Sequence, residues 1–233
     1  MDRFILLIVC VLLGVATVVS MHSQESQPAL SDTTPQFLGQ SGGLQHLTLA
    51  QSAPQTAVLA SGEYTYRAFV KRTRIEDRLD AYPSADIVSF SYEAADTDAD
   101  RKRPVIFMFN GGPGSSSIWL HMTGFGPEKT SADLMNAIDD DVPLSREPNA
   151  GFLIDVGDLV FVDAIGTGLS RVVDADEEGR VKDLRVDAHA MCRYVQNWLK
   201  HEDRVGAPVY VVGVSYSTLR AAGMASHPKC GDF

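Results

Sequence analysis

A glycine-rich turn directly after an apolar run is the feature that most constrains this chain. Residues 104–109 (PVIFMF) predict a buried strand, and residues 110–117 (NGGPGSSS) follow it without a break. Glycine adopts backbone angles that other residues avoid, and it lets a substrate approach the main chain. Such a turn can aim backbone N–H groups at a developing oxyanion. Taken alone, the pattern fits a sharp strand-to-helix turn without a chemical role equally well.

A second turn of this kind lies much further along the chain. Residues 209–212 (VYVV) predict another buried strand, residues 213–217 (GVSYS) a tight turn around Ser215, and residues 218–225 a helix. Strand, G-x-S-x-small turn and helix are the context that a nucleophile elbow requires. The pentapeptide alone is weak evidence, but the two turns together favour a hydrolase with Ser215 as its nucleophile.

The two turns resemble those of serine carboxypeptidases, α/β-hydrolase peptidases marked by N-G-G-P-G-x-S-S and G-E-S-Y-[AG]-G. Residues 159–170 (LVFVDAIGTGLS) are similar to a third family segment, DLVFIDxPxGTGxS, and the three blocks occur in the family's order. The resemblance extends over residues 64–225. It implies an α/β-hydrolase fold that stops soon after the nucleophile elbow, an acyl-enzyme on Ser215, and no metal or cofactor.

The resemblance also implies roles for the residues around Ser215. The backbone N–H groups of Gly112 and Tyr216 would form the oxyanion hole. Asn110 would hydrogen-bond the C-terminal carboxylate of a peptide substrate, with Gly111 beside it in the substrate site. A buried structural role, in which the side chain ties the turn together, is the alternative for Asn110.

Three departures from the family pattern limit what the resemblance implies. Val214 stands where the elbow glutamate is expected and Gly124 where a second acidic residue is expected. Neither can hold a substrate carboxylate, so an esterase or acyltransferase on the same scaffold is an alternative. The family's acid and histidine lie far beyond the elbow, whereas only His227 follows Ser215 here.

His227 cannot be the base if the helix after the elbow continues. Twelve helical positions span about 18 Å, which is far beyond hydrogen-bond reach. We therefore expect the chain as given to lack a complete triad and to have little or no peptidase activity. A catalytically inactive remnant is the third hypothesis. We also expect the elbow strand, residues 209–212, to lie near an open edge of the sheet.

The N-terminal residues predict export. Residues 1–22 have a short charged start at Arg3 and then an apolar run, as signal peptides do. The run is short for a membrane span of about 20 residues, so an uncleaved anchor is the less favoured alternative. We expect a secreted protein or one in another extracytoplasmic compartment (periplasm or lumen), without stable membrane association beyond the leader. Residues 23–62 predict a flexible spacer, and residues 63–233 the N-terminal part of the hydrolase domain.

Composition excludes some partners. The formal net charge is −10 and the isoelectric point about 5.0, so the basic surface that nucleic acid binding requires is missing. A peptide substrate is the expected partner. Cys192 and Cys230 could form one disulfide, and no Cys/His spacing resembles a zinc site.

Several further segments predict the elements that complete the sheet and cover it. Residues 63–70 and 87–92 alternate as half-buried strands do. Residues 116–122 are expected to begin a helix with Ile118, Trp119 and Met122 facing inward. Residues 183–200 predict a longer helix. Its apolar side chains recur at helical spacing: Leu184, Ala188, Met191, Val195 and Trp198.

Overall fold

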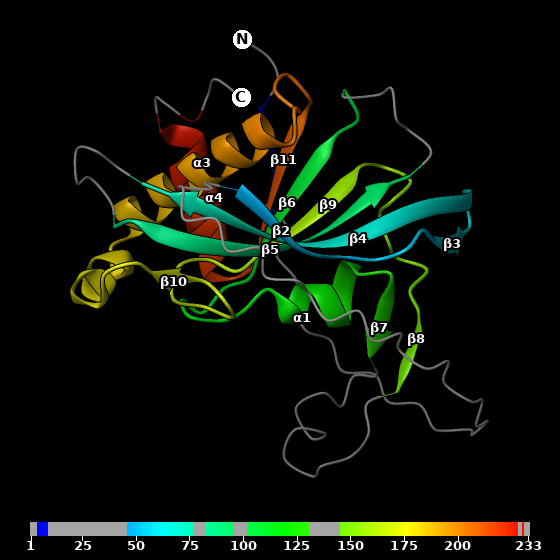
Figure 1. The fold of residues 1–233 in the computed structure, drawn as a ribbon, viewed down its shortest axis with the longest axis horizontal. Coiled ribbons are helices and arrows are strands. Elements are labelled where there is room, and N and C mark those ends of the chain that lie inside the picture. The colour runs from blue at the N-terminus through cyan, green and yellow to red at the C-terminus, as the bar shows by residue number, and fades with distance from the viewer. Residues whose placement is uncertain are drawn as a thin grey trace.

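The computed structural model in Figure 1 has a central twisted sheet with helices on both faces. It describes residues 4–8, 46–76, 83–95, 102–130, 145–227 and 230. Within these residues, the main sheet has nine strands. Seven of them follow the order β1-β11-β6-β9-β5-β4-β2, while β10 pairs with β5 and β3 with β4.

The strands of the main sheet are β1 (Phe4–Ile8), β2 (His46–Gln51), β3 (Gln55–Leu59), β4 (Gly62–Ile75), β5 (Ala85–Ala94), β6 (Val105–Phe109), β9 (Asp158–Val162), β10 (Arg171–Val172) and β11 (Val209–Gly213). Two short strands, β7 (Glu128–Thr130) and β8 (Arg146–Pro148), form a separate antiparallel pair.

The helices are α1 (Ile118–Leu120), which runs into the π-helix η1 (His121–Phe125), the 3-10 helix η2 (Ala175–Lys182), α3 (Leu184–His201) and α4 (Tyr216–Ser226). None of the helices in the described part of the chain is both long and apolar enough to cross a membrane.

The parallel centre of the sheet brings the three predicted motifs to one edge. Strand β6 pairs in parallel with β11 on one side and with β9 on the other. Phe109, at the end of β6, is opposite Gly213 and Val162, the last residues of the two neighbours. The turns that follow these three strands therefore start side by side.

Alternating side chains on β6 divide the interior into two cores. Val105, Phe107 and Phe109 pack in the cluster that α3 and α4 cover. Ile106 and Met108 point to the other face, into the cluster that includes residues of α1 and η1. Because both faces are buried, the strand is continuously apolar, which is why the sequence pattern identified it.

Helix α3 confirms the prediction for residues 183–200. Asp183 is its N-cap, and its carboxylate accepts hydrogen bonds from the backbone N–H groups of Arg185 (2.8 Å) and Val186 (3.4 Å). This satisfies two of the N–H groups that a helix leaves unpaired at its start. Of the five apolar residues at helical spacing, four are buried and Leu184 is half-buried.

The predicted helix after the glycine turn is shorter than expected. Only residues 118–120 are α-helical before the π-helix begins. Ile118, expected to face inward, is 49% exposed, whereas Leu120 is buried.

The predicted spacer extends too far. Of residues 23–62, those from 46 onward are described, and 46–51 and 55–59 form β2 and β3 against β4. These edge strands are largely exposed, so they need few large apolar residues and resemble a linker in composition. Residues 23–45 lie outside the described residues.

The elbow strand β11 lies near an edge of the sheet, as predicted, but the edge strand β1 pairs with it, so its own backbone groups are not left open. Residues 4–8 form β1, which pairs in parallel with the whole length of β11, from Phe4 opposite Val209 to Ile8 opposite Gly213. Strand β11 thus has a neighbour on each side. The signal peptide remains a prediction, and residues 9–22 lie outside the described residues. Removal of residues 1–22 would take β1 away and make β11 the edge strand.

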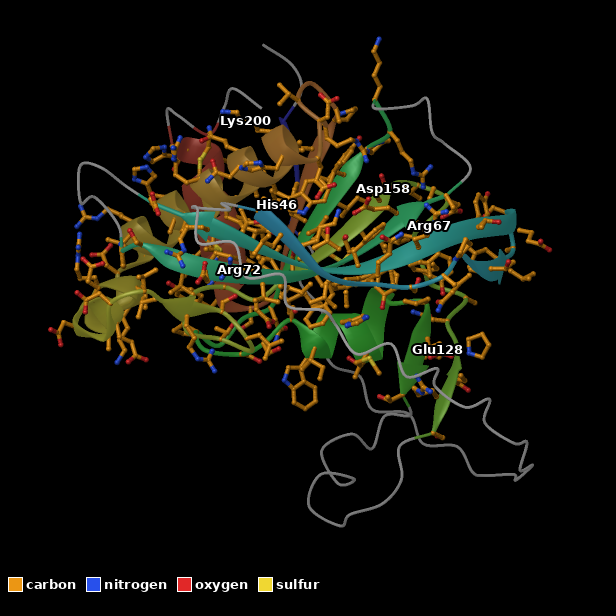
Figure 2. All side chains as sticks on the ribbon, in the orientation of Figure 1. His46, Arg67, Arg72, Glu128, Asp158 and Lys200 are labelled. Atoms are coloured by element: carbon orange, nitrogen blue, oxygen red, sulfur yellow. A yellow bond between two sulfur atoms is a disulfide. The ribbon has the colours of Figure 1, made fainter. Side chains whose placement is uncertain are left out.

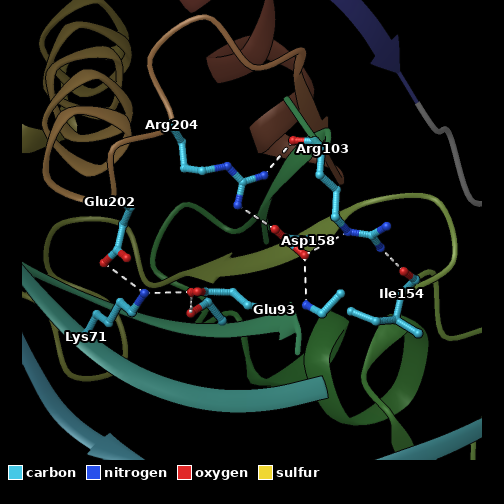
Figure 3. Close-up of polar contacts among 9 residues, drawn as sticks. Lys71, Glu93, Arg103, Ile154, Asp158, Glu202 and Arg204 are labelled. Carbon is cyan, nitrogen blue, oxygen red and sulfur yellow. Dashed lines mark hydrogen bonds and ion pairs between the residues drawn. The ribbon is translucent and has the colours of Figure 1, made fainter. Parts of the chain in front are cut away.

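A buried carboxylate, Asp158, joins three parts of the fold. It opens β9 and is labelled in Figures 2 and 3. It accepts hydrogen bonds from Arg103 Nε (3.0 Å), Arg204 Nη1 (2.6 Å) and the backbone N–H of Ala94 (3.0 Å). With its side chain only 3% exposed, Asp158 is a buried charge that needs these partners.

A second polar cluster joins β4 to the end of α3. The Lys71 ammonium lies 2.6 Å from Glu93 and 2.8 Å from Glu202, and its side chain is 2% exposed (Figure 3). His46 Nε2, on the first residue of β2, lies 2.6 Å from the same Glu202 oxygen. Burial opposes ionisation of Glu202, but the hydrogen bond with His46 and the charge of Lys71 outweigh it and lower the pKa of Glu202 to about 2.

Candidate active site

Ser215 occupies a strained backbone position between β11 and α4. Its φ of 55° and ψ of −123° lie in a region that residues with a side chain rarely adopt. Such conformations cost about 1–3 kcal/mol and persist where the surroundings enforce them. Here the N–H of Val214 bonds to the carbonyl of Phe109 (3.2 Å) on β6, and the N–H of Ser217 bonds to the carbonyl of Val214 (3.1 Å). These contacts hold the exposed Ser215 at the first turn of α4.

The glycine turn lies directly against this elbow. A Cβ added to Gly111 would be 2.7 Å from both Ser215 Cβ and the carbonyl oxygen of Val214, and 3.1 Å from Tyr216 N. Only glycine allows this approach. Gly112, the next residue, is exposed and has a φ of 114°, which also favours glycine. The fold therefore brings both predicted oxyanion residues, Gly112 and Tyr216, to the vicinity of Ser215.

Tyr216 has a backbone N–H group without a partner inside α4. It is the first residue of the helix, and the first four N–H groups of any helix lack intrahelical acceptors. The positive end of the helix dipole lies at the same place. An anion formed beside Ser215 would be stabilised there by both effects.

Asn110 is tied into the structure by its side chain and its backbone. The side-chain Nδ2 donates to Ser115 Oγ (2.7 Å), across the turn. The backbone carbonyl accepts from Arg220 Nη1 (3.2 Å) and from the Ser217 hydroxyl. These contacts support the structural role that the sequence left as an alternative for Asn110. The bond to Ser115 uses one of the two Nδ2 hydrogens, and the other is the donor that a substrate carboxylate would accept.

A buried ion pair supports the elbow from below. Arg220 Nε lies 2.9 Å from Asp187 Oδ2, and the two side chains are 3% and 7% exposed. Burial raises the pKa of Asp187, and the Arg220 charge partly offsets this effect. Because Arg220 also contacts Ser217 and Asn110, it connects α3, the elbow and the glycine turn.

Asp163 organises the loops after β6 and β9. Its carboxylate accepts hydrogen bonds from Ser117 N (2.9 Å), Ser117 Oγ (2.8 Å), Ser116 Oγ (3.0 Å) and Leu169 N (3.0 Å). Gly168 has a φ of 47°, and a side chain there would collide with the Asp163 carboxylate. Asp163, in the third sequence block (residues 159–170), therefore holds the end of the glycine turn in place.

Sequence reasoning missed Asp187 and Arg220 as part of this support. Asp163 lies within residues 159–170, which the sequence singled out, but its role as a hydrogen-bond acceptor for the neighbouring loops was not predicted. Charged residues on helices are usually exposed, so the sequence offered no signal that Asp187 and Arg220 face each other across two helices.

His121 packs against aromatic side chains of the core, where it is hydrogen-bonded and neutral. His121 Nε2 is hydrogen-bonded to the Tyr92 hydroxyl, and its ring stacks on Phe161 with centroids 4.9 Å apart. Burial lowers the pKa of His121 to about 4, although the charge of Asp163 opposes this shift. It is therefore uncharged at neutral pH.

The remaining described histidines also have other surroundings. His46 contacts Glu202 and stacks on His201 with ring centroids 5.2 Å apart. His189 and His227 lie against each other, with ring centroids 4.4 Å apart. Because α4 is continuous over residues 216–226 and His227 is its C-cap, His227 lies at the opposite end of the helix from Ser215. His22 lies outside the described residues.

Val214 and Gly124, which stand where the family has glutamates, both have structural contacts of their own. Val214 is half-buried and packs against the core on the α1 face of the sheet. Gly124 belongs to η1, and its carbonyl accepts a hydrogen bond from Asn149 Nδ2 (2.7 Å). Neither offers a carboxylate to the site.

A strained serine between a parallel strand and a helix, in a sheet of this order, defines an α/β-hydrolase. The family model for serine carboxypeptidases matches residues 83–226 of this chain, which is more than half of its length. The chain belongs to the serine carboxypeptidase family.

Two solved structures were found to be similar over part of their length. One is a prohormone-processing carboxypeptidase, Kex1, of Saccharomyces cerevisiae, with 23% identity and a TM-score of 0.48. The match covers 71% of this chain and 35% of that one. The other is the peroxisomal α/β-hydrolase Lpx1 of the same yeast, with 13% identity, a TM-score of 0.38, and coverage of 69% and 41%. A comparison with curated proteins gave no match.

Proposed function

We propose that this chain is a serine-type carboxypeptidase-like hydrolase that takes part in proteolysis through an acyl-enzyme on Ser215. One observation carries the proposal: an exposed serine with a φ of 55° stands between β11 and α4, in contact with a glycine turn. Family membership supports the peptidase class.

In the proposed reaction, Ser215 Oγ attacks the carbonyl carbon of the substrate. The oxyanion that forms accepts hydrogen bonds from the N–H groups of Gly112 and Tyr216. Each such donor contributes about 10²–10³ in turnover. Asn110 and Gly111 line the substrate site, where the Asn110 amide binds a peptide carboxylate. The oxyanion then collapses, the C–N bond of the peptide breaks, and the C-terminal part leaves as an amine that carries the proton lost by Ser215, so that the acyl group stays on Ser215 as an ester. Water hydrolyses this ester, which releases the acyl part as a carboxylic acid and returns a proton to Ser215.

A serine hydroxyl needs a base to act as nucleophile at neutral pH. The described histidines are engaged elsewhere or lie at the far end of α4. We therefore propose that Ser215 in this chain reacts slowly without an added base. General base catalysis is worth about 10²–10⁴ in rate.

Chemical rescue tests this proposal. The chain is incubated with a fluorophosphonate, which phosphonylates activated serines, with and without added imidazole, and the site is mapped by mass spectrometry. We expect labelling at Ser215 that imidazole accelerates. Ser215→Ala should abolish it, while Ser226→Ala, at the other end of α4, should retain it. An adduct that survives in Ser215→Ala, or no Ser215 adduct in folded protein, would refute the assignment.

An esterase or acyltransferase is the alternative that one feature favours. The apolar Val214 and the backbone-engaged Gly124 remove the two carboxylates that would select a peptide C-terminus. Blocked dipeptides and simple esters of the same acyl group, compared under imidazole rescue, distinguish the two. A preference for peptides with a free C-terminal carboxylate supports the carboxypeptidase, and indifference to that carboxylate supports the esterase.

We also propose an extracytoplasmic location, with a peptide as substrate. The apolar residues after Arg3 support export. Expression of the chain with a C-terminal tag, followed by N-terminal sequencing of the exported form, tests this. Retention in the cytoplasm with an intact N-terminus would contradict it.

A further inference from the structure

Two cysteines and a histidine from distant segments converge at the far end of α4. Cys192, on α3, and Cys230 are joined by a disulfide, with Cα atoms 5.7 Å apart. The Sγ atoms of both cysteines and a ring nitrogen of His227 all lie within 4.8 Å of one another. Both cysteines are fully buried, and His227 is half-buried.

A second histidine adjoins this group. His189 precedes Cys192 by one turn on α3, and residues at this spacing share a helix face. Its ring lies against His227, with centroids 4.4 Å apart and planes 35° from parallel. His227 and Cys230 have the same spacing, and the backbone N–H of Cys230 donates a hydrogen bond to the carbonyl of His227 (2.9 Å).

Close packing of two helices creates this arrangement. Helices α3 and α4 lie side by side (Figure 1), and a Cβ added to Gly223 would be only 2.9 Å from Ala188 Cβ. The absence of a side chain at Gly223 lets the end of α4 approach the middle of α3. An open groove of about 440 Å³, lined by His189, His227 and neighbouring residues, gives access from solvent.

We propose that His189, Cys192, His227 and Cys230 form a zinc site when the two cysteines are reduced. Two thiolates and two neutral imidazoles are one of the common ligand sets of structural zinc. With Zn–S near 2.3 Å and Zn–N near 2.0 Å, tetrahedral ligand atoms lie about 3.3–3.8 Å apart. The ligand atoms of Cys192, His227 and Cys230 lie within 4.8 Å of one another and need only small movements. His189, whose ring lies against His227, would turn its side chain to supply the fourth ligand. The filled site has no net charge, which suits its buried cysteines.

The disulfide and the metal exclude each other, because the same two sulfur atoms serve both. A dithiol reductant transfers two electrons and two protons to the disulfide, giving two thiols and the cyclic disulfide of the reductant. Zinc then displaces one proton from each thiol and binds the thiolates. The cluster thus holds α4 to α3 by a covalent bond under oxidising conditions and by a metal under reducing ones.

This site departs from the sequence-based expectation that no Cys/His spacing resembles a zinc site. Each H-x-x-C pair mixes the two ligand types within one segment, unlike the familiar paired spacings. The repeat of H-x-x-C at residues 189–192 and 227–230 was the available signal. The inference does not rest on the proposed hydrolase activity.

Cobalt is the probe for this site, since Co²⁺ substitutes for zinc and reports its geometry by absorption. The full chain, in a Cys10→Ser background, is reduced with a phosphine, freed of reductant without air and titrated with Co²⁺. We expect one Co²⁺ per chain, the intense visible bands of tetrahedral cobalt, a thiolate-to-cobalt charge-transfer band, and displacement by Zn²⁺. The oxidised chain should show none of these.

Histidine variants distinguish a metal held by all four ligands from a metal held by the two cysteines alone. Both cysteines remain in these variants, so the disulfide can still form. His189→Gln and His227→Gln should each weaken Co²⁺ binding by more than about 100-fold, since even residues that only support ligands cost 10–100-fold. His201→Gln, on the same helix but outside the cluster, should bind as the parent does.

Stability gives a second readout. A metal at 100 times its Kd should raise the Tm of the reduced parent by about 5–10 °C and leave the oxidised chain unchanged. Cobalt binding that is equal in the parent and both histidine variants would overturn the proposal. So would octahedral spectra, or the lack of any metal effect on spectrum and Tm in a reduced chain that circular dichroism shows to be folded.

Discussion

Replacing Arg220 by methionine should strongly destabilise the fold. Met keeps most of the length of the side chain but removes the contacts with Asp187, Ser217 and the Asn110 carbonyl. The Asp187 carboxylate, only 7% exposed, would then be a buried charge without its partner. Breaking a buried pair in this way costs about 3–5 kcal/mol. That is a large part of the typical 5–15 kcal/mol of total stability, and corresponds to a Tm lower by about 6–20 °C.

The loss should depend on pH with a defined sign. Burial raises the pKa of Asp187 above its ordinary value even with Arg220 present, and removing that charge raises it further. A carboxyl with a raised pKa destabilises the fold when ionised, and this penalty disappears as pH falls through the folded pKa toward the pKa of the unfolded chain. The deficit of Arg220→Met is therefore largest at neutral pH and shrinks on acidification.

Urea unfolding of the variant and its parent at several pH values measures this deficit. The double variant Asp187→Asn, Arg220→Met removes the stranded charge and should recover much of the stability at neutral pH. Arg185→Met is a matched control, because the Arg185 side chain is 93% exposed, and it should change the unfolding free energy by less than about 0.5 kcal/mol. The reasoning is refuted if Arg220→Met costs less than about 1 kcal/mol, or if its deficit is the same at every pH.

Three further variants test other parts of the structure. Glu202→Gln should lower the free energy of unfolding by about 3 kcal/mol at neutral pH, because the fold lowers the pKa of Glu202 from 4.5 to about 2. This stabilisation is present above pH 4.5 and is lost as pH falls toward 2. A difference in urea unfolding that does not change with pH would contradict this. Gly111→Ala should slow fluorophosphonate labelling of Ser215 by about 10²-fold, because the new methyl group meets Ser215 Cβ at 2.7 Å, whereas Gly179→Ala, in open surroundings, should label at the parental rate. Phe107→Ala should cost about 3–5 kcal/mol in urea unfolding, since Phe107 is fully buried against Trp198, while Val58→Ala, 77% exposed, should cost less than about 0.5 kcal/mol; similar losses in the two would contradict the assigned core.

The hydrophobic pattern of the sequence predicted those elements that bury side chains at regular intervals along their length. Strand β6 has both faces buried, and α3 buries one face over its whole length. In each case the hydrophobic pattern has the period of the element, and several residues agree. Resemblance to a known family linked the motifs to one another, and the family match over residues 83–226 confirms the family.

Elements that bury little were not predictable in this way. Strands β2 and β3 are held to β4 by backbone hydrogen bonds, and most of their side chains face solvent. Backbone pairing leaves no pattern in the sequence, so these residues resembled a spacer. The change from α1 to a π-helix at His121 is likewise a matter of backbone hydrogen bonding.

The same distinction separates the predictable part of the candidate site from the rest. The glycines and Ser215 are required by backbone geometry, because Gly111 must have no side chain where it meets the elbow and Gly112 has a positive φ. Such requirements are local, so they leave a motif that can be recognised. The Asp187–Arg220 pair depends instead on how α3 packs against α4, which no local pattern records. Substitution of Asp187, which lies on α3 and far from the motif in sequence, should therefore disturb the elbow around Ser215 through Arg220.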